Sequence, residues 1–417
     1  MDHMMLHNLF SKYQYGFLPG RSTVLQLLKI LDQWTEAIDN GNQVEAIYLD
    51  FRKAFDTVPH KRLINKVKHY GIGNPVVSWI TDFLNNRSQK VVVGSKSSVN
   101  IQVSSGIPQG SVLGPVLFLI YINDLPSSVN LEAYIFADDT KLCRICKDGD
   151  NVIQEDLKSL DNWSKKWLLQ FNPTICKQLL IRRSNNDPPP VRYLFDHDKQ
   201  DYSPIPNSSA EKDLGVTVDD QLNFREHIGN CIKKASRNMG IIRRSFTHLD
   251  KDTFVPLYTC LVRSHLEYAQ AVWNPYTRGD IKRIEAVQRN ATKQINGLRD
   301  KCYEERLRIL NLPTLTCRRD RGDMIEVYKI LHEIYDSQCV PSLIRSTNST
   351  RGHAFKLFKR RAQSLNKRKH FFTNRVVDQW NSLPANVVEA SSLNSFKNRI
   401  DKYWKSTGRL YNTEGLI

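Results

Sequence analysis

The residues of this sequence that could do chemistry begin with two adjacent carboxylates, Asp138 and Asp139. They separate two apolar runs, residues 134–137 and 142–146, and two β-prone runs joined by a short polar break predict a β-hairpin with the carboxylates at its tip. Neighbouring anions repel each other unless a cation is bound, and hard divalent ions such as Mg²⁺ prefer carboxylate oxygens. A lone Asp-Asp pair is more often an ordinary acidic turn, so a metal site requires another carboxylate.

Asp50 is the candidate for that third carboxylate. It ends a short, mostly apolar run at residues 44–49, which has the character of a strand. If this strand lies beside the hairpin in one sheet, three carboxylates share an edge and can hold two metal ions, the arrangement used for nucleotidyl transfer. Taken alone, Asp50 is better explained as a residue that caps the end of a strand.

Three segments together resemble the core motifs of a known family of enzymes. They are Leu49-Asp-Phe-Arg-Lys-Ala-Phe-Asp56, Ser105-Gly-Ile-Pro-Gln-Gly-Ser-Val-Leu-Gly-Pro-Val-Leu-Phe118 and Phe136-Ala-Asp-Asp139. In order and spacing they are similar to the reverse transcriptases of non-LTR (LINE-type, jockey-like) retrotransposons. The resemblance continues to the C-terminus, and it implies an RNA-directed DNA polymerase in which a primer 3′-hydroxyl attacks the α-phosphate of a dNTP.

The resemblance also implies roles for individual residues. Asp50, Asp138 and Asp139 would be catalytic and would hold two Mg²⁺ ions (Mn²⁺ being the alternative), with the backbone carbonyl of Phe51 as a further ligand. Phe55 occupies the position at which the family excludes the ribose 2′-hydroxyl, although without the family it is better explained as a core aromatic residue.

A loop and a lysine complete the predicted substrate site. Gly106, Pro108, Gln109 and Gly110 match the loop that lies along the templating base and the incoming nucleotide. Ile175 stands where many relatives have a lysine that serves as a candidate acid for pyrophosphate. Lys177 is the candidate replacement, with a side chain expected to point in a different direction.

The charge of the chain predicts a polyanionic partner. The formal net charge is +17, and residues 346–417 contain 14 Lys and Arg against four Asp and Glu. Basic residues interleaved with phenylalanines can grip a phosphate backbone and stack on bases, whereas the alternatives are a solvated basic helix or a nuclear-import signal. The predicted nucleic-acid-binding residues are Arg21, Lys359, Arg360, Arg361, Lys367, Arg368 and Lys369. The predicted partners are an RNA template, a DNA primer and dNTPs.

The predicted fold is α+β: a right-hand polymerase palm with an antiparallel sheet and packed helices, partial fingers and a helical thumb. The expected division is fingers and palm at 1–182, a Pro-rich linker and a hairpin resembling the primer grip at 183–223, a thumb at 224–345 and a basic C-terminal segment at 346–417. Within the thumb we expect short helix breaks at Gly240, Pro256, Pro275, Gly297 and Pro313. No secretory signal or membrane span is visible, which predicts an intracellular protein of the cytoplasm or nucleus.

A second function stays open beside the polymerase. The chain begins after the upstream finger motifs that the family usually carries, and Ile175 replaces a lysine. The alternative is therefore a catalytically weak, truncated remnant that acts only as a basic RNA- or DNA-binding protein.

Overall fold

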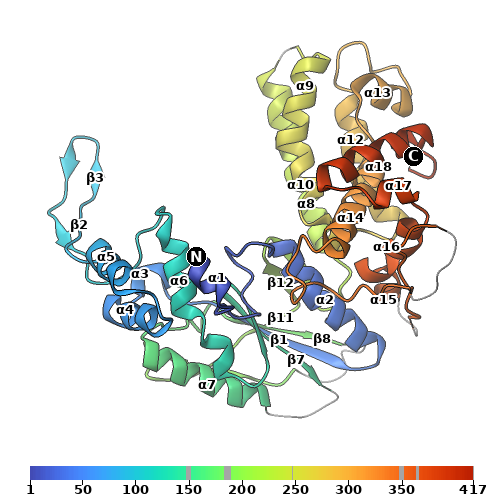
Figure 1. Ribbon diagram of the computed structural model, residues 1–417. Helices are drawn as coiled ribbons and strands as arrows, with labels where there is room; N and C mark the ends of the chain where they lie inside the picture. Colours follow the sequence, from blue (N-terminus) through green and yellow to red (C-terminus); the bar gives the residue numbers. More distant parts are fainter. Residues whose placement is uncertain (147–151, 183–188, 247, 347–351, 363–365, 417) are drawn as a thin grey trace. The chain divides into compact units, whose positions relative to one another are not determined.

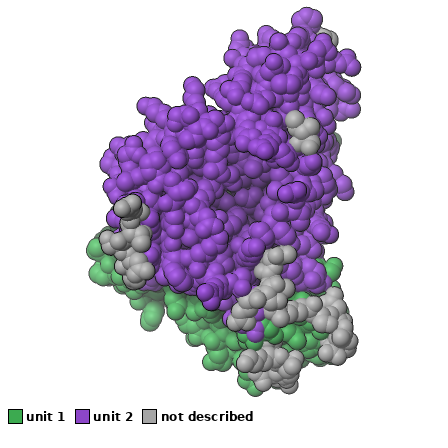
Figure 2. Space-filling view, turned by 90° about the vertical axis from the view of Figure 1, so that its right-hand side faces the viewer, with its two compact units in different colours: residues 1–26, 41–209 green, residues 27–40, 210–417 purple. Residues whose placement is uncertain are grey.

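A computed structural model describes residues 1–146, 152–182, 189–246, 248–346, 352–362 and 366–416. The chain forms two compact units, coloured separately in Figure 2. Unit 1 comprises residues 1–26 and 41–209, and unit 2 comprises residues 27–40 and 210–417. Of the predicted linker, residues 183–188 lie outside the described part of the chain.

Unit 1 is built on a five-stranded sheet with the order β11-β8-β1-β7-β6 (Figure 1). Its strands are β1 (Gln43–Leu49), β6 (Glu132–Phe136), β7 (Asp139–Cys146), β8 (Lys177–Ile181) and β11 (Asn207–Ser208). The β1–β7, β1–β8 and β6–β7 pairs are antiparallel, and β11 pairs with β8 in parallel. The predicted antiparallel sheet and the predicted hairpin at residues 134–146 are therefore confirmed.

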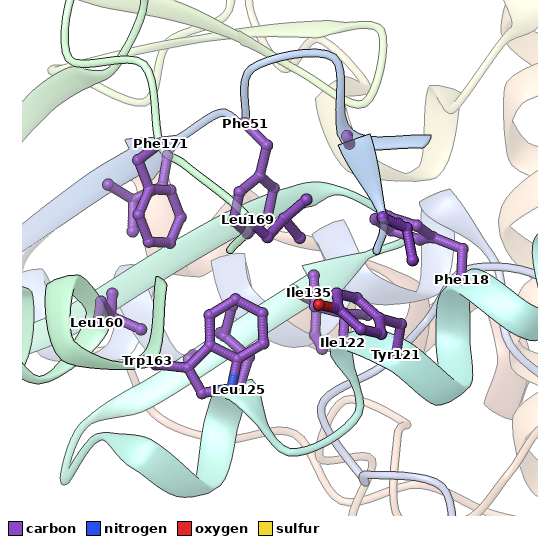
Figure 3. Close-up of a cluster of buried hydrophobic side chains, with 14 of the residues drawn as sticks. Phe51, Phe118, Tyr121, Ile122, Leu125, Ile135, Leu160, Trp163, Leu169 and Phe171 are labelled. Carbon is purple, nitrogen blue, oxygen red and sulfur yellow. The ribbon is translucent and has the colours of Figure 1, made fainter. Parts of the chain in front are cut away.

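Helices cover one face of this sheet. They are α3 (Ala54–Thr57), α4 (His60–His69), α5 (Asn74–Leu84), α6 (Leu113–Ile122) and α7 (Val152–Trp167). Side chains alternate between the two faces of a strand, and Ile47, Leu49, Ile135 and Leu142 belong to a core shared with residues of α6 and α7. Figure 3 shows Ile135 in this core with Phe118 of α6 and Trp163 of α7. Removing this much apolar surface from water is the main stabilisation of the unit.

Smaller elements complete unit 1. They are α1 (Asp2–Leu6), the 3₁₀ turn η1 (Leu125–Ser128), the hairpin of β9 (Tyr193–Asp196) and β10 (Asp201–Pro204), and a ribbon of β2 (Ser88–Gln89), β3 (Val92–Val93), β4 (Lys96–Ser97) and β5 (Ile101–Gln102). In the ribbon β2 pairs with β5 and β3 with β4, and its side chains are exposed.

Unit 2 is mainly helical. It contains most of α2 (Thr23–Asp39) and a hairpin of β12 (Ala210–Asp213) and β13 (Val216–Asp219). Its other elements are α8 (Arg225–Ser245), α9 (Lys251–Leu257), the π-helical turn η2 (Tyr258–Arg263), α10 (Ser264–Glu267), α11 (Gln270–Trp273), α12 (Arg278–Thr292), α13 (Tyr303–Leu310), α14 (Leu315–Leu331), α15 (Asn366–His370), α16 (Phe372–Asn381), α17 (Ala385–Val388), α18 (Leu393–Ser406) and the 3₁₀ turn η3 (Arg409–Tyr411). No helix in the described part of the chain is long and apolar enough to cross a membrane.

Two predicted helix breaks in unit 2 are wrong. Helix α8 continues through Gly240, because Met239 and Ile242 on either side are buried and their packing outweighs the roughly 1 kcal/mol that a glycine costs in a helix. Pro256 lies inside α9, and the chain continues directly into the π-helical turn η2, a local change of hydrogen bonding that accommodates it.

The basic C-terminal residues are part of the same compact unit as the helices before them. Helices α16 and α18 contact α14, and Trp380, Phe396 and Trp404 are almost completely buried. Phe396 stacks on Tyr328 with ring centroids 4.4 Å apart. Deleting residues 346–417 would therefore remove core side chains as well as charge.

Candidate active site

The sheet brings the three predicted catalytic aspartates to one edge. Leu49 of β1 pairs with Thr140 of β7, so extending this register by one residue places Asp50 across from Asp139. Phe136 pairs with Asp139 at the end of the β6–β7 hairpin, which leaves Ala137 and Asp138 as its two turn residues. Directly opposite residues in an antiparallel pair have Cα atoms about 4.5–5.5 Å apart and side chains on the same face.

The electrostatics of this edge suit a bound cation. Burial raises the pKa of the Asp50 carboxyl; a backbone hydrogen bond at Phe51 opposes this, and the nearby charge of Asp138 adds to it. The side chains of Asp50 and Asp138 are half-buried, and that of Asp139 is exposed. Two carboxylates close enough to disfavour each other's charge are stabilised when a divalent ion binds between them.

The aspartates have not closed around a metal position. Across the described residues, no group of three or more His, Cys, Asp and Glu side chains stands ready to hold a metal ion. The donor chemistry nevertheless fits, because carboxylate oxygens are the ligands that hard divalent ions prefer. A complete site requires the three carboxylates to approach one another.

The backbone of Asp50 is anchored by the segment that leads into β8. The Asn172 amide donates to the Asp50 carbonyl at 2.9 Å, and the Asp50 amide lies 3.5 Å from the Cys176 sulfur. Cys176 is fully buried, and burial raises the pKa of its thiol to about 12, so the thiol stays neutral. Next to Asp50, the Phe51 ring stacks on Phe171 with centroids 4.4 Å apart. Sequence analysis missed Asn172 and Cys176, which lie far from Asp50 along the chain.

The predicted substrate loop docks on the segment that follows Asp50. The Ile107 amide donates to the Phe55 carbonyl at 2.8 Å, and the Gly106 amide donates to the Val58 carbonyl at 2.9 Å. The Gln109 side-chain amide donates to the Asp56 carboxylate at 2.9 Å. Phe55 is half-buried and stacks on Phe118 with centroids 4.3 Å apart. The structure therefore brings Phe55 together with the loop that contains Gly106, Pro108, Gln109 and Gly110.

Lys177 lies on the same sheet face as Asp50. It pairs with Tyr48, which is two residues before Asp50 on β1, and residues two apart on a strand share a face. The expectation that the Lys177 side chain points differently from one at position 175 stays a prediction. Ile175 precedes β8 in a turn closed by its own amide on the Asn172 carbonyl at 3.2 Å, and its side chain is 46% exposed.

Arg21 and Arg368 are both tied to their own units. The Arg21 guanidinium donates to the carbonyls of Ser11 at 2.8 Å and Gln14 at 2.5 Å. Arg368 is only 3% exposed, and it binds the Asp32 carboxylate at 2.6 Å. A buried guanidinium cannot reach a phosphate backbone, so the prediction that Arg368 binds nucleic acid is wrong, and its role is to pair with Asp32.

The remaining predicted basic residues differ in how free they are. Lys359 pairs with Asp378, and Arg360 pairs with Glu36 at 3.1 Å. Lys367 is half-buried, and burial lowers the pKa of its ammonium group. Arg361 and Lys369 are exposed.

Sequence analysis missed a second basic surface, on α8. This helix has six exposed basic residues and one exposed acidic residue, Glu226. The basic residues are Arg225, Lys233, Lys234, Arg237, Arg243 and Arg244. A groove of about 390 Å³ runs between α8 and α12 and includes Arg243, Arg283 and Asn290 in its lining. The clustering of basic residues within one predicted helix could have indicated this surface, but the C-terminal segment contributes more of the net positive charge and drew the prediction.

A comparison with known proteins agrees with this arrangement. Residues 1–203, just under half of the chain, match the family described as reverse transcriptase (RNA-dependent DNA polymerase). The curated proteins that it resembles include RNA-directed DNA polymerases of mobile elements. It is 28% identical over 306 residues to the probable RNA-directed DNA polymerase from transposon X-element of Drosophila melanogaster, covering 70% of this chain and 33% of that protein. It is 29% identical over 347 residues to the RNA-directed DNA polymerase from mobile element jockey of Drosophila funebris, covering 78% of this chain and 36% of that protein.

The chain thus spans about a third of the length of these curated relatives. Among solved structures, apo telomerase from Candida tropicalis matches with a TM-score of 0.39 and 9% identity, over 74% of this chain and 52% of that one. A similarity this distant adds nothing to the assignment, which depends on the family match and the retrotransposon relatives.

Proposed function

We propose that this chain is the polymerase part of a retrotransposon enzyme and extends a DNA primer on an RNA template by two-metal nucleotidyl transfer. The observation that carries the proposal is the meeting of Asp50, Asp138 and Asp139 at one edge of the sheet. Two bound divalent ions, Mg²⁺ or Mn²⁺, would activate the primer hydroxyl and neutralise the charge on the leaving pyrophosphate.

Residues of the chain would hold the metal ions in position and select the sugar of the incoming nucleotide. Asp50 and Asp138 would bridge the ions, with Asp139 and the Phe51 carbonyl as further ligands. Phe55, whose ring is held against Phe118, would occupy the space of a ribose 2′-hydroxyl and so favour dNTPs.

The loop and the lysine would orient the nucleotide. The loop from Gly106 to Gly110 would lie along the base pair, because its backbone is already bonded to the Phe55 segment. Lys177, on the face of Asp50, would approach the pyrophosphate. Fixed donors and charges at a developing negative charge contribute strongly to rate because they need no reorganisation during the reaction.

Nucleic acid would be held by exposed basic residues of unit 2. In unit 2 the exposed residues of α8, together with Arg361 and Lys369, supply positive charge for a phosphate backbone. In unit 1 Arg21 shapes the N-terminal segment through its bonds to Ser11 and Gln14.

Primer extension tests the proposal directly. The chain should add dNTPs to a DNA primer annealed to RNA only when Mg²⁺ or Mn²⁺ is present. The double variant Asp138→Asn/Asp139→Asn should abolish extension while keeping the fold, since it preserves side-chain size. Asp82→Asn, an exposed residue of α5, is the matched control and should be fully active. Extension that survives in the double variant would refute the assigned site.

The second candidate is a remnant that binds RNA or DNA without copying it. It is favoured by Ile175, an apolar residue at a position where the family resemblance implies a lysine. Salt-dependent binding of template–primer without any extension would support it. Ile175→Lys should then restore extension if this position is the cause.

A further inference from the structure

The turn that presents Asp138 is strained and needs support from outside the hairpin. Ala137, immediately before Asp138, has φ of +55°, in the left-handed region. For a residue with a side chain this conformation costs about 1–2 kcal/mol and persists only where the surroundings hold it. Ala137 is buried, so those surroundings are protein.

Gln14 supplies the support. Its Oε1 atom accepts hydrogen bonds from the Ala137 amide at 3.0 Å and from the Gly16 amide at 2.7 Å. Both donors are backbone N–H groups, so the atom that faces them must be the carbonyl oxygen of the side chain. Gln14 is 1% exposed, and the hydrogen bond to Ala137 is therefore shielded from water.

The other end of the same side chain shows what this arrangement costs. The Gln14 Nε2 atom is buried and has no hydrogen-bond partner in the described part of the protein. An unpaired buried donor costs about 1–3 kcal/mol. A methionine or leucine would fill the same space without this penalty, so packing alone does not explain a glutamine here.

The backbone around Gln14 is fixed against the edge of the sheet. The Tyr15 amide donates to the Ile135 carbonyl at 2.8 Å, and the Ile135 amide donates to the Tyr13 carbonyl at 2.9 Å, which makes a parallel bridge to β6. Gly16 fits against the turn so closely that an added Cβ would lie 2.5 Å from the Ala137 nitrogen. The Arg21 guanidinium donates hydrogen bonds to the Ser11 and Gln14 carbonyls and so links two points of this N-terminal segment.

From these contacts we infer that Gln14 is a positioning residue for the aspartate turn, which it holds through the Ala137 amide so that Asp138 faces Asp50. The inference rests on the proposed function, because it assumes that these aspartates bind metal. Residues that orient metal ligands without touching the metal typically change affinity or activity by about 10–100-fold when they are replaced.

The test uses the full chain with Mn²⁺ as the probe. Gln14→Met keeps the length of the side chain but removes the acceptor, and Gly16→Ala pushes on the turn from the other side. Both should weaken Mn²⁺ binding, measured by electron paramagnetic resonance without nucleic acid, by about tenfold or more. Both should also lower kcat for extension while leaving the KM for dNTP nearly unchanged.

Two controls separate positioning from general damage. Gln26→Met removes another fully buried glutamine of unit 1, one whose side-chain atoms have no hydrogen-bond partner within the described residues. Gly73→Ala adds a methyl group that meets only Pro75, at 3.9 Å. Neither control should change Mn²⁺ affinity.

Hydrogen–deuterium exchange of the turn peptide, residues 136–140, provides a readout that does not depend on metal. Exchange should accelerate in Gln14→Met and stay at the native rate in Gln26→Met. Unchanged exchange, or faster exchange with native Mn²⁺ affinity, would overturn the positioning role. If instead Asp138→Asn/Asp139→Asn binds Mn²⁺ as tightly as the native chain does, these aspartates are not the metal site, and both the proposed function and the positioning role are refuted. This result is obtained without any Gln14 variant, so it is distinguished from a failure of the positioning role alone.

Discussion

Replacing Gly106 by alanine probes the contact between the substrate loop and the Phe55 segment. Gly106 has φ of +91°, and a Cβ built on it would lie 2.6 Å from the Asp56 carbonyl oxygen. Gly110, in the same loop, has φ of +79° but open space around it, with nothing within 4 Å of its Cβ. Both glycines have a positive φ, but only Gly106 lies close to another part of the backbone, at Asp56. Gly110→Ala is therefore a matched control.

The expected loss of stability follows from these contacts. Both variants pay about 1–2 kcal/mol for placing a side chain in a left-handed conformation. Gly106→Ala must also move the loop away from Asp56, which weakens the bonds from Gly106 to Val58 and from Ile107 to Phe55. At about 1 kcal/mol for each hydrogen bond, the total is about 3–4 kcal/mol for Gly106→Ala against about 1–2 for Gly110→Ala.

Urea unfolding followed by circular dichroism measures this difference. Because a domain is stable by only about 5–15 kcal/mol, the difference of about 2 kcal/mol is large enough to resolve. Gly106→Ala should also raise the KM for dNTP more than Gly110→Ala does, since the loop is displaced from Phe55. Equal losses of stability in the two variants would refute the idea that close packing on Asp56 requires a glycine.

Three further outcomes are expected. Phe55→Val should raise rNTP incorporation with little effect on dNTP use, and unchanged discrimination would leave Phe55 as a core aromatic residue. Arg192→Met should lower the free energy of unfolding, measured in urea, by about 3–5 kcal/mol, because it leaves the buried Glu45 carboxylate without the guanidinium that binds it at 2.7 and 2.9 Å. The double variant Glu45→Met/Arg192→Met should recover most of this loss. A double variant as unstable as the single one would contradict the argument. Burial lowers the pKa of Lys66 from 10.5 to about 8. Between these pH values the unfolded state binds more protons than the folded state, so the contribution of Lys66 to stability rises with pH across that window. Lys66→Met should flatten this rise, and identical pH profiles of stability for the variant and the native chain would refute the role of Lys66.

Local patterns predicted the sheet edge at which Asp50, Asp138 and Asp139 lie, because these residues are at the ends of recognisable strands. The hairpin that contains Asp138 follows from two β-prone runs around a polar break, and Asp50 follows from an apolar run that ends in a carboxylate. Pairing within one hairpin and alternation along one strand are short-range properties, which a sequence displays directly.

Long-range partners were beyond that reasoning. Arg368 is one of a run of basic residues, and only the fold reveals that Asp32 is beside it and that both are buried. Gln14 belongs to a turn-rich stretch with no periodicity, and its contact with Ala137 depends on a bridge between segments far apart in sequence. Composition indicates how many charges a segment has, but the contacts of each charge decide whether it is available to a ligand.

Asp50 and the turn before Asp138 are held in place through their main-chain atoms. Asp50 is held by main-chain contacts to Asn172 and Cys176, and Asp138 follows a turn held by Gln14, so neither anchor uses a carboxylate oxygen of the aspartates. A carboxylate that spent its oxygens on protein donors would have less capacity for a metal ion. Because a divalent cation would offset the repulsion between Asp50 and Asp138, binding of such an ion should stabilise the same edge of the sheet that the buried anchors hold in place.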